Sequence, residues 1–241
     1  MSKESIVYGD TPIEFEVIHE PIPGSKLRIH VHYDGTVQVI APPAYTSSKI
    51  RDGVRKRARW INKHLEKVTA QRKHLLPRRY ISGESHLYLG KRYPLKIVRS
   101  IDPDVKLLRG RLHIYNTSSD TDTVRDLLNG WYRQRAADVF ERRYSEVSSS
   151  IPWLNGNAPS IQLRHMTQQW GSCSPKGKIL LNPSLVKAPR DCIDYVIVHE
   201  LCHLQEHNHS QRFYRLLSQT LPSWEIHKAR LDHMAELLLN K

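Results

Sequence analysis

The chain has 241 residues, of which 37 are Lys or Arg and 24 are Asp or Glu, so its formal net charge is +13. Hydrophobic residues make up 39% and charged residues 25%, which is typical of a globular protein and excludes disordered, collagen-like and low-complexity chains. No apolar run approaches the roughly 20 residues that a membrane span needs, and three widely spaced cysteines exclude a disulfide-stapled miniprotein. The polar N-terminus predicts no secretory signal, and together with the cysteine usage it favours a cytoplasmic protein.

The first part of the chain is predicted to form strands followed by one helix. Alternating apolar residues within 6–45, with a turn signal at Asp34-Gly35, indicate strands and a hairpin. From Ser47 to about His74, apolar residues recur at steps of three and four, which predicts a helix with one buried stripe. The stripe consists of Ile50, Val54, Ala58, Ile61, Leu65 and Val68.

Most of the positive charge lies on and around this helix. Residues 49–79 contain twelve Lys and Arg against two acids. One interpretation is a solvated face that keeps the protein soluble. The other is a site for a polyanion, such as nucleic acid or a nucleotide, with Trp60 and Tyr80 as stacking surfaces. The candidate contacts to the anion are Arg55, Arg59 and Lys63.

The remaining pattern predicts an α+β protein. Strands are expected within 85–116, with turns at Gly90 and Gly110, and a helix follows over 120–147. A loop over 148–160 precedes a hairpin over 161–182. From Pro189 onward we expect helices, which break at Asn208 and Pro222.

This pattern suggests two domains. A β-rich N-terminal region with the basic helix would occupy 1–117, and a second domain would occupy 118–241. The boundary is expected somewhere between 117 and 160, where turn-forming residues are frequent.

The sequence His199-Glu200-Leu201-Cys202-His203 carries the chemistry. Two histidines four residues apart lie on one face of a helix and can bind one metal ion, and neutral imidazole suits zinc. Glu200 follows the first histidine, where a carboxylate can act as a general base on a metal-activated water.

A catalytic zinc needs a third protein ligand from outside this helix. His209 is the best candidate because it follows a polar break after His203; the alternatives are His165, His207, His227 and His233. The competing interpretation is a pair of core histidines satisfied by hydrogen bonds. It is disfavoured because the helix is apolar on nearly every side, so unpartnered imidazoles inside it would be costly.

Residues before this helix offer further candidates. Gly171, in Trp170-Gly171-Ser172-Cys173, would let the backbone approach another group closely or turn sharply. Cys173 is either a fourth metal ligand or a packed small residue, and the second interpretation is favoured because a closed site would lose its catalytic water. Gln169 and Asn182 are candidate substrate or oxyanion contacts. Cys202 is expected in the core.

Several segments together resemble the YgjP-like metallopeptidase domain, a group related to the SprT-like and WLM proteases. They are Arg164-x-Met166-x-x-x-Trp170-Gly171-Ser172-Cys173, Leu181-Asn182, Ala188-Pro189, Ile193-Asp194-Tyr195-Val196-x-Val198-His199-Glu200-Leu201-x-His203-Leu204 and Asn208-His209-Ser210-x-x-Phe213. The front half is similar too, through Ile40-Ala41-Pro42-Pro43 and Gly90-Lys91-Arg92-Tyr93.

The resemblance implies a zincin-like C-terminal domain, zinc bound by His199, His203 and His209, and a catalytic Glu200. The spacing from His203 to His209 equals that of metzincins, but Glu206 stands where those enzymes have glycine. Relatives in the SprT-like and WLM groups cleave proteins attached to DNA, which is consistent with the basic helix.

Three functions follow as hypotheses. The leading one is a zinc-dependent peptidase, with proteins associated with nucleic acid as a candidate class of substrate. The second is a zinc-dependent hydrolase of nucleoside triphosphates that holds its substrate through Lys and Arg side chains, since the chain has no Gly-rich phosphate loop. The third is a nucleic-acid-binding module with a structural zinc, which Glu200 argues against because a structural site needs no base.

Overall fold

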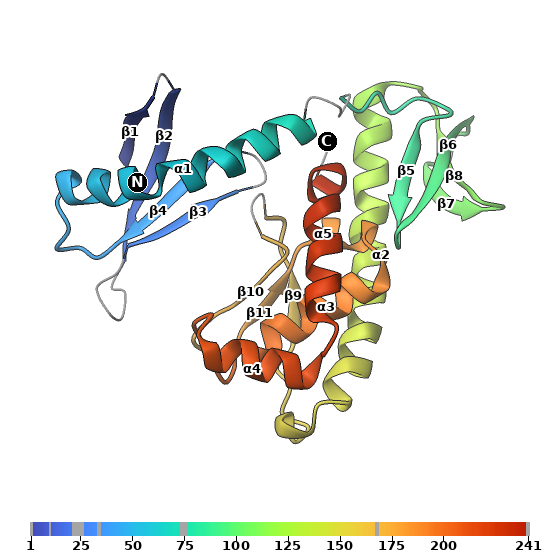
Figure 1. Cartoon of the computed structure of the whole chain (residues 1–241). Helices are drawn as coiled ribbons and strands as arrows, with labels where there is room; N and C mark the ends of the chain where they lie inside the picture. Colours follow the sequence, from blue (N-terminus) through green and yellow to red (C-terminus); the bar gives the residue numbers. More distant parts are fainter. Residues whose placement is uncertain are drawn as a thin grey trace. The chain divides into compact units, whose positions relative to one another are not determined.

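The chain folds into two compact units, Met1–Leu76 and Pro77–Lys241 (Figure 1). The computed structural model describes residues 2–9, 11–20, 27–32, 35–72, 77–166 and 169–239.

The first unit is a four-stranded sheet covered by one helix. The spatial order of its strands is β1-β2-β4-β3; β1 pairs antiparallel with β2, β2 parallel with β4, and β4 antiparallel with β3. Their bounds are Ser2–Tyr8 (β1), Thr11–His19 (β2), Arg28–Val31 (β3) and Val37–Ala41 (β4). The expected hairpin joins β3 to β4, and Gly35 has a φ of 81°, while Asp34 lies outside the described residues.

Helix α1 (Ser47–Arg72) buries the predicted stripe against this sheet. Ile50, Val54, Ala58 and Ile61 are at most 1% exposed, and Leu65 packs at the edge of the same core. Their sheet partners include Ile13 and Val39. The spacing of three and four therefore predicted the buried face correctly from Ile50 to Leu65, whereas Val68 is only half-buried; Lys73 and His74 lie outside the described residues.

The second unit begins with another four-stranded sheet, in the order β5-β6-β8-β7. Its strands are β5 (Ser85–Tyr88), β6 (Lys91–Arg99), β7 (Asp104–Leu108) and β8 (Arg111–Asn116). Gly90 and Gly110 occupy the predicted turns with φ of 78° and 75°. At Gly90 a Cβ would lie 2.8 Å from the Pro189 Cγ, so glycine lets this turn pack against the start of a later helix.

Helix α2 (Thr121–Ser149) ties this sheet to the rest of the second unit. It begins at Asp120, whose carboxylate accepts a hydrogen bond from the Thr123 backbone N–H at 3.0 Å. The helix contacts β7 and β8, and also the short 3-10 helix η2 (Pro183–Lys187) and the helix α3 that follows it. The compact units therefore do not coincide with the expected division between 117 and 160: the strands of 85–116 pack with the C-terminal elements because one helix contacts both.

The remaining elements hold the candidate site. The 3-10 helix η1 (Pro152–Leu154) lies within the predicted loop 148–160. The hairpin of β10 (Gly171–Cys173) and β11 (Ile179–Leu181) forms as predicted, and β9 (Ile161–Leu163) pairs parallel with β11. The helices that follow are α3 (Arg190–Cys202), α4 (Gln211–Thr220) and α5 (Trp224–Leu239), with the breaks at the predicted places.

The residues that the structure describes contain no helix long and apolar enough to cross a membrane.

Candidate metal centre

Helix α3 is buried along most of its length, as its apolar composition predicts. Nine of its thirteen residues are buried, and Glu200 is one of them. His199 lies in the last turn, and His203 caps the C-terminal end. The helix therefore carries two imidazoles and a carboxylate into a largely apolar environment.

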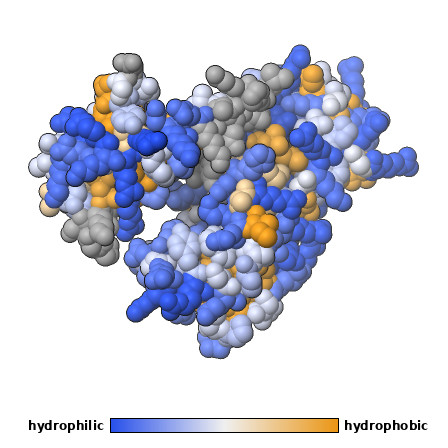
Figure 2. Space-filling model, in the orientation of Figure 1, coloured by the Kyte–Doolittle hydropathy of each residue, from blue (hydrophilic) through white to orange (hydrophobic). Residues whose placement is uncertain are grey.

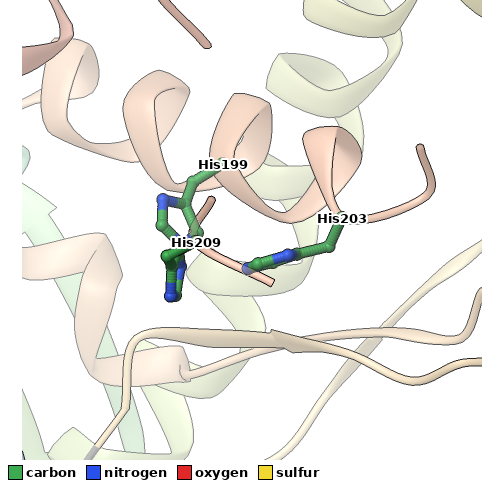
Figure 3. Close-up of side chains that lie close together, drawn as sticks. All are labelled: His199, His203 and His209. Atoms are coloured by element: carbon green, nitrogen blue, oxygen red, sulfur yellow. The ribbon is translucent and has the colours of Figure 1, made fainter. Parts of the chain in front are cut away.

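Three histidines converge at the end of α3 (Figure 3). His209 comes from the loop between α3 and α4, and one ring nitrogen of each histidine lies within 4.8 Å of those of the other two. The Nε2 atoms of His199 and His209 are only 2.9 Å apart. Within the described part of the chain this is the one group of three His, Cys, Asp or Glu side chains that could hold a metal ion.

The backbone orients one of these rings. The Nδ1 atom of His203 lies 3.0 Å from the Glu206 carbonyl oxygen. Because a carbonyl oxygen only accepts, Nδ1 must donate, which leaves Nε2 with its lone pair exposed to a metal. Glu206 stands where metzincins have glycine. Because its backbone carbonyl oxygen orients the His203 ring, this contact does not depend on the Glu206 side chain.

Phe213 packs against all three imidazoles. Its ring centroid lies 5.0 Å from that of His199, 4.6 Å from His203 and 4.7 Å from His209. The side chain is fully buried. Ser210 begins α4 by accepting a hydrogen bond from the Phe213 backbone N–H, which places the aromatic ring in the first turn of the helix.

Burial also shifts the ionisation of this group toward the metal-binding form. The pKa of His199 falls to about 3, mainly through burial and then through the neighbouring His209 and His203. Burial likewise lowers the pKa of His203. Neutral imidazoles have the lone pairs that a metal ion requires.

The Glu200 carboxylate is pressed against the backbone of β10. A Cβ at Gly171 would lie 2.6 Å from Glu200 Oε1 and 2.9 Å from its Cδ, which is closer than real Cβ contacts. The predicted close backbone approach at Gly171 is thus confirmed, and the partner is Glu200. Burial raises the pKa of Glu200 to about 8.

The two cysteines near the site differ in exposure. Cys173 does not belong to the histidine group, and its Sγ contacts the Ser174 carbonyl oxygen at 3.6 Å. Burial, and then the charge of Glu200, raise its thiol pKa to about 11, which disfavours the thiolate. Cys202 is fully buried in the core, as expected.

The two candidate substrate contacts also occupy different environments. Gln169 is exposed. Asn182 is fully buried, and its amide is used within the protein: Nδ2 donates to the carbonyl oxygens of Met166 and Gln169 at 2.6 and 3.0 Å, and Oδ1 accepts from the Ser184 N–H. This geometry gives Asn182 the role of holding the loop before β10.

The alternative third ligands lie outside the histidine group. His165, His207 and His233 are exposed. His227 is engaged elsewhere, with its Nε2 at 2.8 Å from the Ser223 Oγ and its Nδ1 at 3.4 Å from Asp191.

The candidate anion contacts belong to the other compact unit. Arg55, Arg59 and Lys63 are exposed on α1, and Arg55 pairs with Asp52 at 3.2 Å. Tyr80, a candidate stacking surface, is only 7% exposed and lies in the second unit, so it is a core residue.

Phe213 is the residue at this centre to which sequence reasoning gave no role. Its position in the sequence was suggestive, because it stands four residues after His209 at the start of a new helix. Before the fold is known, however, such an aromatic residue cannot be distinguished from an ordinary core residue.

The sequence matches the family described as YgjP-like, metallopeptidase domain, over residues 25–234. Among solved structures it is similar to the crystal structure of the metallopeptidase zymogen of Pyrococcus abyssi abylysin, with 25% identity and a TM-score of 0.35 over 41% of this chain and 94% of that chain. No curated protein matches the chain. Since the family match spans most of the sequence, the chain belongs to the YgjP-like metallopeptidase family.

Proposed function

We propose that the chain is a zinc-dependent peptidase in which His199, His203 and His209 hold the metal and Glu200 transfers protons. One observation carries the proposal: three imidazole groups converge with ring nitrogens within 4.8 Å of one another, and the residue that follows His199 in α3 is the buried Glu200.

The donor set fits zinc. The Nε2 atoms of His199 and His209 are 2.9 Å apart, so their lone pairs would repel each other unless a cation or a proton lay between them. Three imidazoles with one open position are a common ligand set for catalytic zinc. When bound, the zinc supplies Lewis acidity, which activates a water molecule and polarises the scissile carbonyl group.

In its ionised form, Glu200 would take the proton of the attacking water and give it to the leaving amine. It is adjacent to His199 in sequence, and the Gly171 backbone restricts its carboxylate from the other side. A fixed carboxylate loses little freedom when it reaches the transition-state geometry, so this restraint favours the reaction.

The substitution Glu200→Gln tests the assignment. It keeps the size of the side chain and removes its basicity, so we expect zinc content unchanged and peptidase activity on an unfolded protein reduced by at least about 100-fold. The matched control is Glu225→Gln, an exposed carboxylate in the first turn of α5, which should retain full activity. Full activity of Glu200→Gln would refute the proposal.

Zinc removal completes the test. A chelator should abolish activity and zinc should restore it, and the alanine variants of His199, His203 and His209 should each lose stoichiometric zinc. The same assays run with nucleoside triphosphates would detect triphosphate hydrolysis in place of peptide cleavage. Zinc retention with no hydrolysis of either substrate would favour a structural metal.

A further inference from the structure

Trp60 is an aromatic side chain that the first unit leaves in solvent. It lies on α1 and is 42% exposed, whereas the apolar stripe of the same helix is at most 1% exposed between Ile50 and Ile61. The core of this unit is therefore complete without the indole ring. An exposed tryptophan contributes little to folding, so its surroundings decide what it can bind.

Those surroundings are cationic. On a helix, the neighbours of a residue are three and four positions away in either direction. For Trp60 these are Lys56, Arg57, Lys63 and His64. Lys56, Arg57 and Lys63 are exposed, and the His64 ring lies 4.3 Å from the indole. We call Lys56, Arg57, Trp60 and Lys63 the Trp60 patch.

The cations of the Trp60 patch are not neutralised by their own unit. Among the described residues, Lys56, Arg57 and Lys63 have no hydrogen bond or ion pair, whereas Arg51 and Arg55 of the same helix pair with Glu4 and Asp52. A helix face that serves only solubility commonly places Glu and Lys at intervals of four. Here no acid occupies a position adjacent to Trp60. In Figure 2 the surface of this unit, at the left, is mostly hydrophilic.

We propose that the Trp60 patch binds single-stranded nucleic acid, with Lys56, Arg57 and Lys63 on the phosphates and the Trp60 indole stacked on a base. Cations that follow the backbone, interleaved with an exposed aromatic ring, are the elements of sequence-tolerant binding to single strands. In a duplex the bases are already stacked, so the indole would have no partner.

A membrane surface is the other polyanion to consider. A helix that lies in a bilayer interface inserts its apolar face among the lipids. The apolar face of α1 is covered by the sheet through Ile50, Val54, Ala58 and Ile61. Within the first unit only the polar face is left uncovered, which favours a nucleic acid over a lipid surface.

The test is a fluorescence anisotropy titration of a labelled oligothymidylate of about 20 nucleotides with the full chain over a range of salt concentrations. The logarithm of the binding constant should fall linearly with the logarithm of salt, by about 0.7 for each phosphate contact. Lys56→Gln/Arg57→Gln/Lys63→Gln should therefore reduce the slope by about 2. Trp60→Ala should weaken binding by about 5- to 100-fold, and Trp60→Phe by less.

A control variant separates local binding from net charge. Lys91→Gln/Arg92→Gln/Lys96→Gln removes three exposed cations from β6 in the other unit and lowers the net charge equally. It should bind the oligonucleotide within about twofold of the wild-type chain. Circular dichroism melting curves establish that each variant is folded, as expected for exposed side chains.

Several results would overturn the proposal. They are an equal loss in the two triple variants, unchanged binding by Trp60→Ala, tighter binding to duplex than to the single strand, or binding to phosphatidylserine vesicles without binding to the oligonucleotide. Because these measurements do not involve Glu200 or zinc, their failure would leave the proposed peptidase function untouched.

Discussion

The helices α1 and α3 show two opposite ways in which a sequence places polar groups. In α1 the polar residues surround an apolar stripe and lie in solvent, where charges need no partner. In α3 the apolar residues surround the polar ones, and Glu200 is only 5% exposed. A buried carboxylate and imidazoles must be compensated, so α3 indicates chemistry more strongly than α1 does.

The largest expected effect comes from a substitution outside α3 that displaces the buried Glu200 carboxylate. Gly171→Ala places a methyl group within 3 Å of the Glu200 carboxylate, which is buried and has little room to move. We expect kcat to fall by at least about 100-fold while zinc content and KM change little, because a displaced base misses the proton it should take. Steady-state kinetics and metal analysis measure both.

Gly130→Ala is the control for this substitution. Gly130 lies in α2, and a Cβ there would meet no atom within 4 Å. The exchange should leave activity unchanged and stabilise the protein by up to about 1 kcal/mol, because alanine is the better helix former. If Gly171→Ala kept the wild-type kcat, the close contact between Gly171 and the Glu200 carboxylate would have no role in the reaction.

Truncation of one core side chain in each unit sharpens the contrast. Phe213→Ala removes the ring shared by the three histidines and should lower the free energy of unfolding by about 3–5 kcal/mol. We expect zinc affinity to fall as well. Ile61→Ala should cost the first unit about 2–5 kcal/mol and leave zinc affinity unchanged, because its side chain belongs to a separate core. Calorimetry and competition with a chelator measure the two effects; equal zinc affinities in both variants would contradict this role of Phe213.

The smallest expected effect concerns pH and another buried polar group of the second unit. Burial, helped by Arg78, lowers the pKa of His86 to about 4 despite the nearby Glu84. As pH falls below 6.5, the ordinary pKa of histidine, His86 becomes protonated in the unfolded chain but stays neutral in the folded chain. The free energy of unfolding therefore decreases until about pH 4.

His86→Gln should flatten this part of the stability profile. Urea unfolding at pH 7 and pH 5 compares the two chains, because glutamine cannot titrate. An identical loss in both would assign the pH dependence to other groups.

Local patterns gave correct predictions wherever one element decides the outcome. The stripe from Ile50 to Ile61 is buried as its spacing requires, and Gly90 and Gly110 occupy turns. The pairing of β2 with β4, which are parallel and distant in sequence, has no local signal. The expected division near 117–160 does not coincide with the compact units, because α2 contacts β7 and β8 before it in the chain as well as η2 and α3 after it.

The sequence by itself predicted a metal-binding site, because His199 and His203, four residues apart, share one face of an apolar helix and, with Glu200, are polar groups buried whatever the rest of the fold. Only the tertiary structure decided that His209, among several histidines, joins them, that Phe213 lies against all three rings, and that Gly171 fits against the carboxylate. These relations join different elements, and the distances between elements are set by packing rather than by the spacing of residues along the chain.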